Sequence, residues 1–110
     1  MVDVKKLEKR FDGSRETMRE VANEYFKLVR EVLDSCLTAM NEDDSETVHT
    51  QAHKLKGSAR LLGADKLGDL AEKMEHAAAI KEMDAVRQLY PDFKTEATES
   101  IQTLRRYLQK

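Results

Sequence analysis

The stretch AHKLKGSARLLGADKL, residues 52–67, decides how this chain is expected to fold. At 100° per residue, its apolar side chains gather on one half of a helix. Gly63 suits a left-handed C-terminal cap and Asp65 suits the N-cap of a following helix. The pattern therefore predicts a helix, a tight turn and a second helix. Gly57 is the anomaly, because glycine inside a helix costs about 1 kcal/mol relative to alanine.

The segments before this stretch also read as helices. Residues Val2 to Phe11 form a short candidate helix, which the Asp-Gly-Ser sequence at 12–14 ends. Ser14 can then cap a long amphipathic stretch that runs to about Asn41, with apolar residues three and four apart. A polar turn follows, and Asp44 or Ser45 would cap the helix that carries the opening stretch.

The segments after this stretch complete the fold. Asp84 is the expected cap of a last amphipathic segment, in which Pro91 favours a short helix to Tyr90 and then a kink or a fresh start. Four substantial amphipathic helices with short turns predict an all-α fold, an antiparallel four-helix bundle with an additional short N-terminal helix. A single domain is expected over residues 1–110, with the N-terminal helix and turn at 1–13 and the bundle at 14–110.

Composition limits the classes of partner. The 110 residues carry a formal net charge of −2, which argues against a general nucleic-acid binder. The single cysteine, Cys36, fits a reducing compartment, and no apolar stretch approaches the roughly 20 residues that span a bilayer. We expect a cytoplasmic monomer without nucleic-acid or direct membrane contact, or the cytoplasmic domain of a longer, membrane-anchored chain.

The outer face of the helix over residues 45–62 carries the candidate chemistry. With His53 at the centre, Gly57 and His49 lie about 40° to either side, Lys56 about 60° away and Arg60 about 20° away. An imidazole is an available nucleophile near neutral pH. Lys56 and Arg60 could steady a phosphoryl group on its Nε2 atom, and Gly57 would leave a partner room to reach it.

Metal and nucleotide sites are disfavoured on the same residues. His49 and His53 lie one turn apart, a spacing that can hold a metal, but Lys56 and Arg60 would repel a cation. The sequence has no glycine-rich nucleotide loop and no acidic cluster for Mg²⁺. We therefore expect no metal, no bound cofactor and no ATP site.

The motif resembles the histidine-containing phosphotransfer (HPt) domains of bacterial multistep phosphorelays. The likeness rests on AHxLKGSA at residues 52–59, LGAxxL at 62–67 and the flanking helices. It implies that His53 accepts a phosphoryl group from a receiver-domain aspartate and passes it to another, with Lys56 and Gly57 in the lysine and glycine roles of the family. Counted along the motif, Glu75 takes the position that hydrogen-bonds the imidazole Nδ1 in several members.

The resemblance also implies the partners. They are response-regulator receiver domains, which would supply Mg²⁺, and a hybrid sensor histidine kinase is a further candidate. As an isolated domain the chain would be a phosphotransfer intermediate and not an enzyme. Two alternatives stay open: a docking module for a receiver or kinase that carries no phosphate, and the phosphate-accepting domain of a chemotaxis-type kinase.

Three residues around the motif are expected to contact a docking partner. Arg60 lies on the same face as His53 by helix rotation, and His49 flanks it on that side. Leu61 lies about 80° from His53, where it either contacts the receiver or packs at the edge against the next helix.

Overall fold

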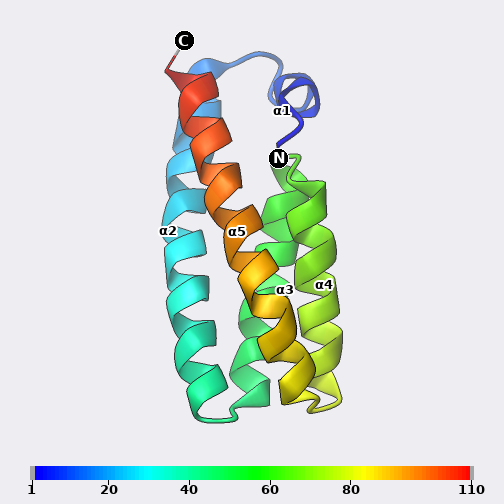
Figure 1. Cartoon of the computed structure of the whole chain (residues 1–110). Helices are drawn as coiled ribbons and strands as arrows, with labels where there is room; N and C mark the ends of the chain where they lie inside the picture. The colour runs from blue at the N-terminus through cyan, green and yellow to red at the C-terminus, as the bar shows by residue number, and fades with distance from the viewer. Residues whose placement is uncertain (1, 110) are drawn as a thin grey trace.

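The computed structural model describes residues 2–109 and contains five helices in that range (Figure 1). A short helix, α1, comes first, and four longer helices follow it. Their bounds are α1 Val4–Arg10, α2 Arg15–Asn41, α3 Ser45–Leu61, α4 Asp65–Ala79 and α5 Met83–Leu108. No helix among these residues is long and apolar enough to cross a membrane.

The four long helices form an elongated antiparallel bundle of 42 × 19 × 18 Å, which confirms the predicted fold class (Figure 1). Each helix packs on the next along the chain, and α5 closes the ring against α2. The α3–α4 pair therefore stands opposite the α2–α5 pair. Short turns force this order, because consecutive helices joined by a few residues must lie side by side.

Two of the four predicted helix caps are confirmed and two are wrong. The Ser14 hydroxyl accepts from the Thr17 backbone N–H, and the Asp44 carboxylate does the same for Thr47. Asp65 and Asp84 instead lie inside the first turns of α4 and α5, whose N-cap residues make no side-chain cap hydrogen bond. A carboxylate in a first turn still stabilises a helix through its dipole, and the predicted caps lie one residue after the true N-cap at Asp65 and two residues after it at Asp84.

The predicted fresh start at Pro91 is wrong, because α5 is one helix from Met83 to Leu108, while the alternative, a kink at Pro91, stays a prediction. Proline removes one backbone hydrogen bond from a helix interior. Pro91 lies on the exposed side of α5, where water can satisfy the carbonyl left without a partner. Val86 and Phe93 are fully buried on the opposite side, so packing keeps the helix continuous.

The core is mainly apolar along all four long helices, and it includes a buried polar contact between α2 and α5. Tyr25 and Ser100 share a hydrogen bond of 2.7 Å between their hydroxyl groups, and Ser100 also donates to the Ala97 carbonyl. Cys36 is a free, buried thiol of the core, and its burial raises the pKa to about 11. The thiol therefore stays protonated and unreactive at neutral pH.

The N-terminal segment is anchored on the turn between α3 and α4. The expected helix from Val2 to Phe11 is shorter at both ends, since the Asp3 backbone is extended and its carboxylate caps α1. The Asp3 backbone N–H donates to the Gly63 carbonyl at 2.9 Å. Gly63 itself has φ +78°, as the sequence predicted for a left-handed cap.

Replacing Gly63 with alanine is expected to destabilise the fold by about 2–4 kcal/mol. The left-handed backbone strains any side chain, and a Cβ atom would lie 2.8 Å from the Asp3 carbonyl oxygen. Gly13 is the matched control, because it has φ +72° and open space around it. Gly13→Ala should lower the free energy of unfolding in urea by only about 1–2 kcal/mol, the cost of a side chain on a left-handed backbone. If both variants lose the same free energy of unfolding, the close contact between Gly63 and Asp3 does not add to the cost of a side chain at position 63.

Candidate functional site

His53 lies on the outer face of α3, as the helix rotation predicted. Its side chain is 65% exposed. The opposite side of α3 is fully buried in the bundle, through Val48, Ala52, Leu55 and Ala59. The imidazole is therefore fixed to a rigid, well-packed helix and still meets solvent.

Glu75 of α4 bridges His53 and Lys56. One carboxylate oxygen, Oε2, lies 2.6 Å from His53 Nδ1, and the other, Oε1, lies 2.6 Å from Lys56 Nζ. The contact between Glu75 and the imidazole is the one expected from the motif. The ion pair with Lys56 was not foreseen, because it depends on how α4 packs against α3.

The Glu75 carboxylate determines which imidazole nitrogen is free. A carboxylate can only accept hydrogen bonds, so His53 Nδ1 must carry its hydrogen. In the neutral ring, Nε2 then holds the lone pair. Burial acts to raise the pKa of Glu75, but the hydrogen bonds from Lys56 and His53 outweigh it and hold that pKa below its usual value. The carboxylate is therefore ionised at neutral pH.

His49 is a third basic side chain beside Glu75. Its Nε2 atom lies 3.8 Å from Glu75 Oε2, one turn before His53 on the same helix. No group of three or more His, Cys, Asp or Glu side chains within residues 2–109 is placed to hold a metal ion. The two imidazoles thus converge on a carboxylate whose other oxygen is taken by Lys56.

Glu75→Gln is expected to lower the free energy of unfolding by about 1 kcal/mol at neutral pH, because it removes charge from two hydrogen bonds. The pKa of Glu75 is lowered in the folded state, so its stabilisation is present above the unfolded pKa, near 4.3, and is lost as pH falls through the folded value. Urea unfolding should therefore show the difference from the parent shrinking towards zero at about pH 3.

Glu31→Gln is the matched control for this pH dependence. Glu31 is exposed on α2 and has no ion pair among the described residues. Its substitution should change stability little at any pH. If the Glu75→Gln difference stays constant from neutral to acid pH, the carboxylate does not provide the charge-dependent bridge that the geometry shows.

Gly57 faces open space one turn after His53. A Cβ atom built at Gly57 would meet no atom within 4 Å outside its own helix. Packing within this chain therefore does not require glycine here. The role inferred from the sequence, access for a partner to His53, stays a prediction, and the space that it needs is present.

Arg60 is not the free cation that helix rotation suggested. Its guanidinium pairs with Asp69 at 3.3 Å and Glu72 at 3.4 Å, both on α4. Its side chain also crosses Gly68, where an added Cβ would lie 2.7 Å from Arg60 Cγ. Asp69 and Glu72 are three residues apart in the sequence, which places them on one face of α4. Whether that face meets α3 depends on the packing angle between the two helices. A docking role for Arg60 stays a prediction.

Leu61 is one of the few exposed large apolar side chains, at 42%. It lines a shallow groove between α2 and α3 together with Val21, Tyr25 and Leu28. Apart from Leu62, the C-cap residue of α3, the other apolar residues of this groove lie on α2, and none lies on α4, against which edge packing was considered. Contact with a docking partner stays a prediction for Leu61, as it does for His49.

Comparison with known proteins finds similarity over most of this chain. The Hpt domain model matches residues 20–107. The chain is 25% identical over 93 residues to the phosphorelay intermediate protein rdeA of Dictyostelium discoideum, which covers 84% of this chain and 37% of that protein. It therefore spans well under half the length of that relative.

A solved structure shares the fold. Histidine-containing phosphotransfer protein B (HptB) from Pseudomonas aeruginosa PAO1 superposes with a TM-score of 0.91 over 98% of this chain and 94% of that one, at 18% identity. At 18% identity this similarity supports only the shared fold. The family match, in contrast, extends from α2 to the end of α5 and includes the His53 motif. The chain belongs to the Hpt domain family.

Proposed function

We propose that this chain is a phosphorelay intermediate in which His53 accepts a phosphoryl group from a receiver-domain aspartate and passes it to another. The observation that carries the proposal is the exposed imidazole whose Nδ1 atom is held by Glu75. That contact leaves Nε2 as the nucleophile on the surface. The family match and the likeness to a phosphorelay intermediate support the same reading.

The proposed transfer balances without a further reactant. The Nε2 lone pair attacks the phosphorus of the aspartyl phosphate, an N–P bond forms, and the P–O bond to the aspartate breaks to release its carboxylate. The ring keeps its Nδ1 hydrogen and gains positive charge. Glu75, already ionised at Nδ1, compensates that charge. The reverse steps deliver the phosphoryl group to a second aspartate.

Lys56 and Gly57 support this chemistry in different ways. Lys56 Nζ has hydrogen-bonding capacity beyond its bond to Glu75, since an ammonium group offers three donors. It can therefore pair with the phosphoryl oxygens without releasing Glu75. Gly57 leaves space beside the ring, and in-line transfer needs the receiver's aspartate close to Nε2.

The docked receiver is proposed to supply the metal ion for phosphoryl transfer. We propose that the domain binds no ATP and holds no metal of its own, so a docked receiver brings the Mg²⁺ that stabilises the transferring group. The proposed partners are response-regulator receiver domains and a hybrid sensor histidine kinase. The buried, protonated thiol of Cys36 is compatible with the reducing cytoplasm, where we place this relay.

The test is phosphotransfer from ³²P-labelled receivers to the whole chain. We expect label that is labile in acid and stable in base, as phosphohistidine is. We also expect ³¹P and ¹⁵N NMR of the product to place the phosphoryl group on Nε2, because Nδ1 is occupied. No label from any receiver of the source genome, an acid-stable label, or phosphate on Nδ1 would overturn the proposal.

A further inference from the structure

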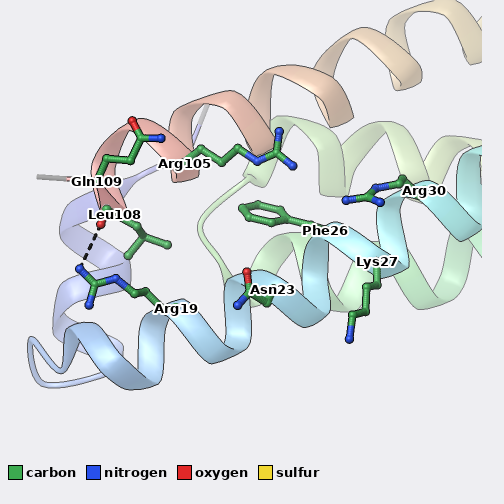
Figure 2. A pocket seen from close by; sticks show the side chains of 8 residues that line it. All are labelled: Arg19, Asn23, Phe26, Lys27, Arg30, Arg105, Leu108 and Gln109. Carbon is green, nitrogen blue, oxygen red and sulfur yellow. Dashed lines mark hydrogen bonds between the residues drawn. The ribbon is translucent and has the colours of Figure 1, made fainter.

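A basic groove runs between α2 and α5, on the side of the bundle opposite α3 and α4 (Figure 2). Its volume is about 590 Å³. Four cationic side chains line it: Arg19, Lys27, Arg30 and Arg105. No acidic residue lines it among those that the structure describes, although the chain as a whole has more acidic than basic residues.

The floor of this groove is apolar and recessed. Phe26 and Leu108 line it and are each only 8% exposed. The Arg105 guanidinium lies over the Phe26 ring, 5.0 Å from its centroid. Figure 2 shows Arg105 of α5 and Phe26 of α2 on the two sides of the groove. Arg19 donates to the Leu108 carbonyl at 3.2 Å. These contacts hold two of the cations in place at the end of the groove where α5 ends.

The other two cations are available to a ligand. Arg30 has no hydrogen bond or ion pair among the described residues. Lys27 has only a loose, exposed pair with Glu24, at 3.6 Å. Like charges gathered in one groove repel one another. A ligand with negative charge would remove that repulsion and supply the missing hydrogen-bond acceptors.

We infer that this groove binds an acidic peptide segment of a partner protein, with carboxylates on the four cations and an apolar side chain against Phe26 and Leu108. The charge complementarity identifies the ligand as anionic, and the sunken apolar floor favours a side chain as its anchor. A peptide fits an open groove better than a small molecule, which needs a pocket that encloses most of its surface.

Two other anionic partners fit the groove less well. A membrane-binding surface inserts exposed apolar residues into the bilayer, whereas Phe26 and Leu108 are each only 8% exposed. Nucleic acid selects strongly basic domains, and this chain has a net charge of −2. The acidic surface outside the groove would repel either polyanion, while a short peptide contacts the groove alone.

The location adds a second docking surface to the domain. His53 and Glu75 lie on the α3–α4 side of the helix ring, and the groove lies on the α2–α5 side. A peptide in the groove therefore leaves His53 open to a receiver. The inference goes beyond the proposed function and does not depend on it.

The experiment is selection of displayed random peptides of about 15 residues, or ~22 Å if helical, against the whole chain. The enriched peptides should carry several Asp or Glu residues around one large apolar residue. A synthetic copy of the strongest peptide should shift the amide signals of α2 and α5 in ¹⁵N NMR. Lys27→Glu/Arg30→Glu should weaken its binding at least tenfold, a change of about 1.4 kcal/mol.

Lys73→Glu/Lys94→Glu is the matched control, because both lysines are exposed outside the groove and the change in net charge is the same. This control should bind the peptide within twofold of the parent chain. Enrichment of neutral or basic peptides, no enrichment, or equal weakening by both double variants would overturn the inference. Tighter binding of phosphatidylserine vesicles, single-stranded DNA or ATP to the same residues would also overturn it.

Discussion

His53→Gln is expected to carry no acid-labile phosphoryl label after incubation with a phosphorylated receiver. The variant loses the Nε2 lone pair, and no other group on this face takes its place in the proposed reaction. Glutamine keeps a donor that can reach the Glu75 carboxylate, and position 53 is exposed. The fold and the free energy of unfolding should therefore change little, so that loss of label reports on chemistry.

His49→Gln and His76→Gln are the controls for this loss. His49 lies one turn away and also approaches Glu75, and His76 is exposed beside Glu75 in α4. Both variants should accept the same amount of label as the parent chain. Label on His53→Gln would refute the proposed function. If His53→Gln binds a receiver and transmits the signal as the parent does, the domain is a docking module that carries no phosphate.

Gly57→Gln is expected to slow phosphoryl transfer by about 10²-fold, because small misplacements at a reacting centre have effects of that size. A glutamine side chain would occupy the open space beside His53 and hold the receiver's aspartate away from Nε2. The rate should be measured in single-turnover transfer with excess receiver. Receiver binding, measured separately, shows how much of the loss comes from docking.

Gly57→Ala is the matched variant that adds a methyl group without much bulk. The site has open space and ordinary helical backbone, so alanine should raise the free energy of unfolding by about 0.5–1 kcal/mol. Transfer should slow far less than with glutamine. Full transfer activity of Gly57→Gln would show that access is not the reason for glycine at this position.

Most of the fold could be predicted from residue patterns. The apolar spacing, the Ser14 and Asp44 caps and the turn at Gly63 gave four long helices in antiparallel order. The fresh helix start at Pro91 was wrong, since local propensity disfavours proline in a helix but burial of Phe93 and its neighbours in α5 outweighs that cost. The predicted start of α1 at Val2 was also wrong, because Asp3 lies outside the helix. Its carboxylate caps α1, and its backbone N–H donates to the Gly63 carbonyl.

The candidate site was predictable where it lies on one helix. Helix periodicity alone placed His53 outward, with Lys56 and Gly57 beside it. Glu75 came from counting along a family motif, and its second contact, with Lys56, could not be foreseen. Contacts between helices could not be predicted in this way. Helix rotation placed Arg60 beside His53, but in the structure its guanidinium pairs with two carboxylates of α4.

The sequence by itself determined the helices, their order and the face that carries His53. These follow from periodicity, capping and turn length, which act between residues close in the chain. Only the tertiary structure decided which side chains meet across helices: Glu75 with His53 and Lys56, Arg60 with Asp69, and four cations around a groove between α2 and α5. The physical reason is that such contacts depend on the packing angle and axial shift between helices, which the interlocking of core side chains sets and no single helix pattern contains.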